Sequence, residues 1–319
     1  MTLKLCAPTL ALAAVVSLTA PTAMAQEFPS KPVVIVVGPG PDAMPRLFGH
    51  KLTEMWGQPV VVEPQPGGGG IMAMRTVTRA APDGHAMLLT TGSYTINEVI
   101  RPNFPLSLAR DFSPAALIGT LSFMLLVHPS VPAQSLQELL KLAREKPGEL
   151  NCASSGIGTT AHLGCEMLSH YGGVKILHVP YKGVAPALND MLAGRAHVMF
   201  SVPTAIAHVQ SGALRALAVT GPRRLSTLPD VPTVAEAGLP DLTFSSWNGL
   251  HLPAHTPKAV VAKINADVAK VRGMPDVQKR MQELGFTPEG GDPESFAQFV
   301  SADIERWRKA GKDTRVQVE

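Results

Sequence analysis

Short apolar stretches alternate with segments of helical periodicity along most of the chain. The first apolar stretch, residues 32–37, predicts a strand, and apolar residues then recur at helical spacing from Met44 to Trp56. The same pattern predicts strands over 59–62, 86–90, 150–153, 176–179, 197–200 and 214–219, and helices over 72–80, 135–146, 160–170, 185–192 and 204–210. Buried strands that alternate with helices are typical of an α/β protein whose parallel sheets are covered on both faces.

Two longer apolar stretches, 116–127 and 242–252, do not fit this alternation. We interpret both as strands that cross between two lobes, because a chain of 319 residues exceeds what one core usually encloses. The first lobe is expected over 26–122 and 247–319, and the second over 123–246. Three helices near the C-terminus are expected to pack back on the first lobe, over 258–271, 276–284 and 293–309.

The N-terminus has the features of a cleaved export signal. Lys4 precedes an apolar run from about Leu10 to Leu18, and the small-residue stretch Ala23-Met24-Ala25 follows. The run is shorter than the roughly 20 apolar residues that span a bilayer. We therefore expect cleavage after Ala25, a signal peptide over 1–25, and a mature protein in the periplasm.

Charge and cysteine content narrow the classes of partner. Removing residues 1–25 takes away Lys4 and no acidic residue, so the balance of 28 basic to 25 acidic residues becomes 27 to 25. A nucleic-acid surface needs a larger basic excess, so we expect a small molecule or a protein as partner. Cys152 and Cys165 remain after processing, and the sequence leaves open whether they pair or stay free and buried.

Three loops at predicted strand ends carry the candidate chemistry. They cover residues 38–42, 67–70 and 154–160 and are rich in glycine or hydroxyl side chains. In open parallel sheets, ligands bind where such loops lead into helix N-termini, whose unpaired amides favour anions. Glycine lets the backbone approach a ligand closely. These loops predict a site for a carboxylate.

Each candidate has a simpler structural explanation. Asp42 is suited either to contact a ligand or to cap the helix that follows it. The glycine run and the polar residues from Ser93 to Thr95 fit either the ligand site or ordinary loops. The loop at Ser154–Thr160 would, on its own, equally suit a helix cap.

Two other kinds of site are not expected. His162, Cys165 and Glu166 share one helix face, but no second ligand pair at zinc-like spacing accompanies them, so no metal and no cofactor are expected. Instead, His162 is expected to border the site or to bond the preceding loop. A serine hydrolase would need a nucleophile turn with glycine two residues to either side of the serine, which neither Ser154 nor Ser155 has.

Several motifs in register resemble one known family. They are Phe28-Pro29-Ser30-Lys31-Pro32, Gly57-Gln58-Pro59-Val60-Val61-Val62-Glu63, Ala81-Pro82-Asp83-Gly84, Ala153-Ser154-Ser155-Gly156, Val179-Pro180-Tyr181-Lys182-Gly183 and Pro229-Asp230-Val231-Pro232-Thr233-Val234. Together they resemble the Bug receptors, the substrate-binding proteins of tripartite tricarboxylate transporters, from about Phe28 to Lys312.

The resemblance implies a two-lobed, type II (Venus-flytrap) periplasmic binding protein with a hinge of two crossover strands. Its ligand would be a small carboxylate, and its partners two integral-membrane transporter subunits. We expect a monomer without enzymatic activity; a ligand sensor for a membrane signalling partner is the alternative. The expected ligand-binding residues are Gly38, Gly40, Asp42, Gly68, Gly69, Ser93, Ser154, Ser155, Gly156, Thr159, Thr160, His162 and Tyr181.

The sequence also departs from the family pattern at two places. The loop from Gly38 to Asp42 is about three residues shorter than usual, and it contains Pro39 and Pro41, which have no amide hydrogen. Ser201-Val202 replaces an acidic residue and an asparagine that many members carry. An amino-bearing ligand would lose a counter-charge, so we rank di- or tricarboxylates first, aromatic carboxylates second and amino acids last.

Overall fold

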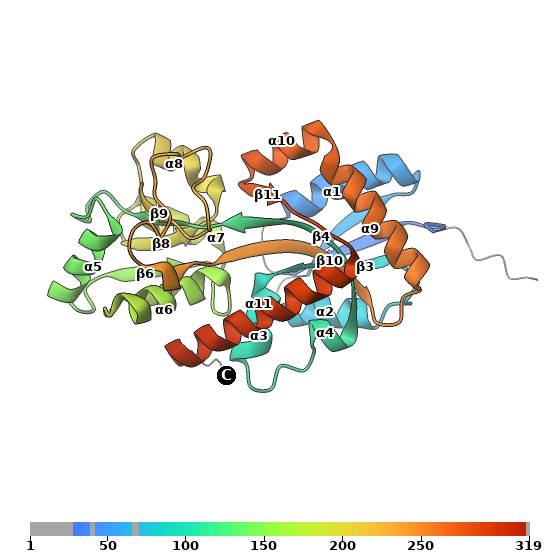
Figure 1. The fold of residues 1–319 in the computed structure, drawn as a ribbon, viewed down its shortest axis with the longest axis horizontal. Helices are drawn as coiled ribbons and strands as arrows, with labels where there is room; N and C mark the ends of the chain where they lie inside the picture. Colours follow the sequence, from blue (N-terminus) through green and yellow to red (C-terminus); the bar gives the residue numbers. More distant parts are fainter. Residues whose placement is uncertain (1–27, 39–41, 66–69, 317–319) are drawn as a thin grey trace, which may run out of the picture.

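The computed structural model describes residues 28–38, 42–65 and 70–316. In this part of the chain, two sheets lie side by side and form two lobes (Figure 1). The first-lobe sheet has the order β11-β4-β10-β3-β1-β2, formed by Phe286–Pro288, Phe112–Ser122, Ser245–Pro253, Ala86–Thr91, Val33–Val37 and Val60–Pro64. The second-lobe sheet has the order β7-β6-β8-β5-β9, formed by Leu177–Pro180, Asn151–Ser154, Val198–Ser201, Met124–Val127 and Arg215–Val219.

Both sheets are mixed, so the prediction of parallel sheets is correct only in part. In the first lobe β1 pairs in parallel with β2 and β3, whereas β10 runs antiparallel to both β3 and β4. In the second lobe β6 is parallel to β7 and β8, and β5 is antiparallel to β8 and β9. The outgoing strand β4 and the returning strand β10 lie side by side, and they must therefore run in opposite directions.

Helices cover both faces of the first-lobe sheet, as predicted. One face packs against α1 (Ala43–Trp56), α9 (Lys258–Gly273) and α10 (Pro275–Glu283). The other packs against α2 (Ile71–Thr78), α4 (Leu108–Asp111) and the first half of α11 (Pro293–Thr314). Among the described helices, none combines the length and the apolar character that crossing a bilayer requires.

The second-lobe sheet is covered in the same way. One face packs against α5 (Leu136–Glu145) and α6 (Thr160–Gly172), and the other against α7 (Val184–Leu192) and residues next to α8 (Ile206–Gln210). Short 3-10 turns at Pro203–Ala205 and Pro240–Leu242 complete the lobe. Ser135 caps α5 as predicted, since its hydroxyl accepts from the amide of Glu138.

The last helix corrects the expected packing of the C-terminal region. Phe296 and Val300 of α11 are buried in the first lobe, but Trp307 and Ala310 are buried in a cluster formed largely by second-lobe residues. The hydroxyl of Tyr171 in α6 also donates to Asp313 near the end of α11, at 2.9 Å. Helix α11 therefore spans both lobes (Figure 1) instead of packing on the first alone.

The chain crosses between the lobes at two places that are bonded to each other. Phe123 links β4 to β5, and the segment from Thr220 to Phe244 links β9 to β10. The amide of Thr220 donates to the carbonyl of Phe123 at 2.9 Å, and the amide of Phe244 donates to the carbonyl of Thr220 at 3.0 Å. These contacts hold both crossovers together at the junction of the lobes.

Candidate functional site

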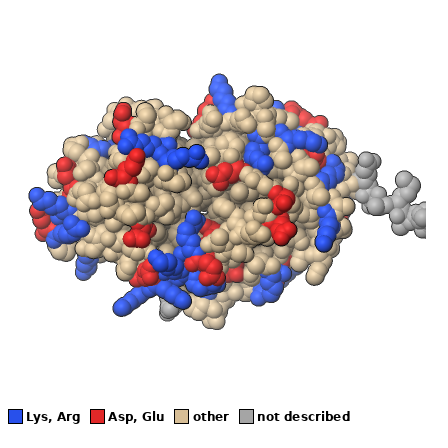
Figure 2. Space-filling view, in the orientation of Figure 1, with Lys and Arg blue, Asp and Glu red and all other residues tan. Residues whose placement is uncertain are grey.

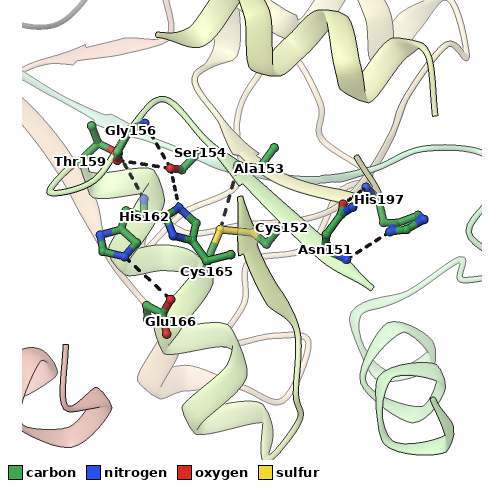
Figure 3. The surroundings of a disulfide bond; sticks show 11 residues. Asn151, Cys152, Ala153, Ser154, Gly156, Thr159, His162, Cys165, Glu166 and His197 are labelled. Carbon is green, nitrogen blue, oxygen red and sulfur yellow. Dashed lines mark hydrogen bonds and ion pairs between the residues drawn. A yellow bond between two sulfur atoms is a disulfide. The ribbon is translucent and has the colours of Figure 1, made fainter. Parts of the chain in front are cut away.

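The loop Ser154–Thr159 lies between β6 and α6 and is held in a compact conformation (Figure 3). The Thr159 hydroxyl donates to the carbonyl of Gly156 at 2.7 Å and accepts from the amide of His162 at 3.3 Å. Thr159 is therefore the N-cap of α6. The carbonyls of Ser154 and Ser155 accept from the amides of Tyr181 and Gly183 beyond β7, at 3.0 and 3.2 Å.

A disulfide joins the two ends of this segment. Cys152 in β6 is bonded to Cys165 in α6, with 5.9 Å between their Cα atoms. Both residues are buried. The alternative that the sequence left open, a pair of free thiols, is not what the structure contains.

Two stacked histidines, His162 and His178, pack beside the loop Ser154–Thr159. The rings of His162 and His178 lie 4.2 Å apart, and the amide of Gly158 donates to Nδ1 of His162 at 3.2 Å. Burial lowers the pKa of His162 to about 3, with the neighbouring His178 adding to the effect, and burial lowers the pKa of His178 to about 4. Both rings are therefore neutral near pH 7.

These histidines and Glu166 also come close enough to be considered as metal ligands, since one ligand atom from each lies within 4.8 Å of the others. The hydrogen bond from Gly158 occupies the lone pair of Nδ1 in His162, so the ring proton is on Nε2. Nε2 faces the Glu166 carboxylate at 3.8 Å. Metal binding through Nε2 would move the ring proton to Nδ1, where it would face the N–H of Gly158, so the arrangement fits a polar support for the loop better.

The distance between the Ser154 hydroxyl and the His178 ring matches that of a nucleophile and its base in a serine hydrolase, but the rest of the arrangement does not. The Ser154 oxygen lies 2.7 Å from Nε2 of His178 and is also bonded to Gly156. However, Ser154 has 0% of its surface exposed. The expected ligand contact through the Ser154 hydroxyl is not supported by this position, because the hydroxyl is enclosed within the second lobe.

The first-lobe part of the site is formed by α3 (Gly92–Ile100), a helix that the sequence pattern did not predict. Thr91 caps it by accepting from the amide of Ser93 at 3.3 Å. Tyr94 in its first turn packs beside Gly38 and Gly70, and a Cβ at Gly70 would lie 2.7 Å from its ring. The Tyr94 hydroxyl is buried and donates to no acceptor in the described residues. Burial raises the pKa of this phenol, and the nearby backbone amide of Gly38 offsets part of that rise.

The N-termini of α3 and α6 meet at the junction of the lobes. A methyl group placed on Gly92 would lie 3.5 Å from the hydroxyl oxygen of Thr160 and 3.3 Å from that of Ser246 in β10. Thr160 is only 3% exposed, and its hydroxyl also lacks a partner within the described part of the chain. We call the region that extends from Gly92, Thr160 and Ser246 along the first turn of α3 to Tyr94 and Gly38 the interlobe site.

A hydrogen bond beside the interlobe site connects the lobes directly. The side-chain amide of Asn97 in α3 donates to the carbonyl of Gly158 at 2.9 Å and to that of Ser93 at 2.7 Å. Neither Asn97 nor Ser246 was singled out from the sequence. The spacing of Asn97 behind a strand end gave no local signal, because its partner lies 61 residues away.

The remaining predicted residues have different positions. Gly40, Gly68 and Gly69 lie outside the described residues. Asp42 makes no side-chain cap bond; its carboxylate instead pairs with Arg46 at 2.7 Å. Tyr181 donates its hydroxyl to Asp190 at 2.7 Å and its backbone amide to the carbonyl of Ser154 in the loop; its expected contact with a ligand stays a prediction.

Two hollows lie elsewhere on the surface. One is bordered by the ends of α5 and α6, and the other lies between β4, the residues after β11 and α11. Neither brings together helix N-termini and unpaired hydroxyls. On the face shown in Figure 2, acidic and basic side chains are interspersed over both lobes.

Comparison with known proteins gives the family. Residues 44–314 match the tripartite tricarboxylate transporter family receptor model. A solved structure of an R. palustris protein with adipate is 33% identical, with a TM-score of 0.86, and the match covers 91% of this chain and 99% of that one. The periplasmic binding protein BugD is 30% identical, with a TM-score of 0.84 and coverages of 92% and 100%. MatC from Rhodopseudomonas palustris with bound malate is 30% identical, with a TM-score of 0.82 and coverages of 89% and 99%. The chain therefore belongs to the tripartite tricarboxylate transporter receptors, the family that its motifs predicted.

Proposed function

We propose that this protein is a periplasmic receptor that captures a small carboxylate at the interlobe site for a tripartite transporter. The observation that carries this proposal is a pair of buried hydroxyls, Tyr94 from one lobe and Thr160 from the other, which donate to no acceptor among the described residues. A buried hydroxyl without a partner is costly, and a ligand that accepts a hydrogen bond removes that cost. The two flanking helix N-termini favour a ligand with negative charge.

The class of ligand is supported by two relatives. Solved structures of similar proteins contain adipate and malate, which are both dicarboxylates. The β8 strand of this chain ends at Ser201 and is followed by Val202, so no carboxylate stands there to pair with an amino group. A di- or tricarboxylate is accordingly our first choice, and an aromatic carboxylate the second.

Binding is proposed to bring the lobes together. We assign residues 26–122 and 247–319 to the first lobe and 123–246 to the second, with the bonded crossovers as the hinge. Ligand donors come from both sides of the junction, so closure completes the set of donors. Small-angle scattering should show compaction when the ligand saturates the protein.

Export, membrane partners and the lack of enzymatic activity complete the proposal. The signal peptide over 1–25 would deliver the protein to the periplasm, where two integral-membrane subunits would accept the ligand. Loss of carboxylate uptake in a deletion strain would support transport, whereas loss of gene induction with normal uptake would favour the sensor. Turnover of any carboxylate or ester by the purified protein would overturn the non-enzymatic assignment.

The decisive experiment compares affinity with stability. Native mass spectrometry and calorimetry with succinate, malate, citrate, adipate and benzoate would first identify a ligand. Thr160→Val and Tyr94→Phe should then each weaken binding about tenfold or more, since a hydrogen bond to a charged group contributes about 1.5–3 kcal/mol. Neither change should lower the melting temperature much, because neither hydroxyl donates a hydrogen bond to any residue in the described part of the chain.

A matched control separates the two quantities. The buried Thr256 hydroxyl donates to the carbonyl of Pro253 at 2.7 Å, beyond the end of β10 that is opposite to Ser246. Thr256→Val should lower stability by about 1 kcal/mol and leave affinity unchanged. If Thr160→Val behaved like this control, the assignment of the interlobe site would be wrong.

A further inference from the structure

The disulfide closes a covalent ring around the second-lobe half of the interlobe site. Cys152 lies in β6 before the loop Ser154–Thr159, and Cys165 lies in the second turn of α6 after it. The ring therefore contains the whole loop and Thr160. Figure 3 shows the bond between strand and helix, directly beneath the loop.

The hydrogen bonds of the loop and the disulfide fix different parts of it. The bonds from Tyr181 and Gly183 attach the beginning of the loop to the segment after β7. The cap by Thr159 and the bond from Gly158 to His162 are local to the start of α6. The disulfide instead links the strand to the helix itself.

The position of α6 relative to β6 determines where the Thr160 hydroxyl points. We propose that the Cys152–Cys165 disulfide is a positioning element of the carboxylate site, which holds the first turn of α6 so that Thr160 and the neighbouring amides face the ligand. This inference rests on the proposed function, because it assigns a role in the same site. The cysteines themselves are buried and would not touch the ligand.

Glycines inside the ring explain why a covalent link matters here. Gly156 and Gly158 have φ angles of 134° and 77°, in a region that other residues rarely adopt. Glycine also reaches many other conformations, so a loop without the cross-link would populate several. Apparent affinity falls in proportion to the fraction of molecules in the binding-competent conformation.

The test is the double variant Cys152→Ala/Cys165→Ala, compared with wild type at a temperature where both are folded. We expect affinity for the best ligand of the dicarboxylate panel to fall about tenfold, as a competent fraction of about one tenth would give. Hydrogen exchange should accelerate in peptides that cover residues 153–163. Leu139→Ala is the control, because Leu139 is buried in α5 outside the covalent ring but in the same core cluster, so it shows whether weaker packing of this core alone lowers affinity.

The outcomes separate this inference from the proposed function. Affinity within twofold of wild type with unchanged exchange would overturn it, and so would an equal loss of affinity in Leu139→Ala. If wild type binds no carboxylate, the proposed function fails. Hydrogen exchange in residues 153–163 then decides alone whether the disulfide orders the loop.

A second experiment tests the same inference if the double variant does not fold. Wild type is treated with dithiothreitol, which gives up two electrons and two protons and becomes its cyclic disulfide, while the two cysteines become thiols. Intact mass confirms the gain of two hydrogens. Reduced, folded protein that binds and exchanges like the oxidised form would overturn the inference.

Discussion

Thr220 and Phe123 are joined by two hydrogen bonds in opposite directions. The amide of Thr220 donates to the carbonyl of Phe123 at 2.9 Å, and the Thr220 hydroxyl accepts from the amide of Phe123 at 3.0 Å. Thr220 is fully buried. One side chain thus completes the backbone bonding at the point where the first crossover leaves the six-stranded sheet.

Replacing Thr220 by Val should therefore destabilise the junction of the lobes. The Phe123 amide would be left buried without an acceptor, at a cost of about 1–3 kcal/mol in the free energy of unfolding. Urea denaturation measures this change. Ser211→Ala is the comparison. The exposed Ser211 hydroxyl donates to the backbone carbonyl of His208, and its loss should lower the free energy of unfolding by less than about 0.5 kcal/mol. Equal costs in the two variants would contradict the role of Thr220.

Two glycines with similar backbone angles should respond differently to alanine. Gly70 and Gly212 have φ angles of 99° and 76°, but a Cβ at Gly70 meets the Tyr94 ring whereas one at Gly212 meets nothing within 4 Å. Gly212→Ala should cost only the roughly 1 kcal/mol of backbone strain. Gly70→Ala should cost more, and it alone should weaken ligand binding. Calorimetric titration and thermal melts of both variants give the answer, and matching results would exclude a specific contact with Tyr94.

The protein should lose stability in acid because of its buried imidazoles. Burial lowers the pKa of His162 to about 3, of His178 to about 4 and of His251 to about 3, while unfolded histidine titrates near 6.5. The unfolded chain therefore binds more protons between pH 6.5 and 4, so stability is complete above about pH 6.5 and declines below it.

Urea denaturation between pH 7.5 and 4.5 tests this expectation. We expect a loss on the order of a few kcal/mol over that interval. His178→Gln should flatten the pH dependence, because one of the neutral buried rings is removed. A free energy of unfolding that stayed constant or rose toward pH 4.5 would contradict the prediction.

Asp303 should be the most sensitive acidic residue of α11. Its buried carboxylate accepts from the Thr95 hydroxyl at 2.6 Å and from the Trp247 indole at 2.9 Å, and so connects three elements. Asp303→Asn places a donor among these donors and should cost about 2–4 kcal/mol in urea denaturation. The carboxylate of Asp313 accepts from the hydroxyl of the partly exposed Tyr171, so Asp313→Asn should lower the free energy of unfolding by about 1 kcal/mol or less. The reverse order would refute this assignment.

Local patterns were sufficient for elements whose apolar residues follow one period. Helix α5 was predicted correctly because its cap, Ser135, and its apolar face are both visible in the sequence. Helix α3 was missed because its first turn is polar and it depends on distant partners, such as Asp303 for Thr95. The antiparallel direction of β10 was also missed, since an apolar run does not specify which neighbour it pairs with.

The candidate site was predictable as loops but not as individual contacts. The sequence indicated the loop Ser154–Thr160, and the structure places Thr160 at the lobe junction. It could not indicate that Ser154 bonds to His178, or that the Tyr94 hydroxyl is buried against Gly38, because both depend on residues brought together only by folding. The disulfide was undecided for the same reason: the strand and helix spacing that permits it is a tertiary property.

Helix α11 gives the protein a built-in optical probe. The Trp307 indole is buried among second-lobe residues, with its ring centroid 6.1 Å from that of Phe244, and its nitrogen donates to Asp303 at 3.2 Å. The same helix is packed on the first lobe through Phe296. Rotation of one lobe against the other must therefore change the surroundings of this indole, so intrinsic fluorescence can report lobe motion without any attached label.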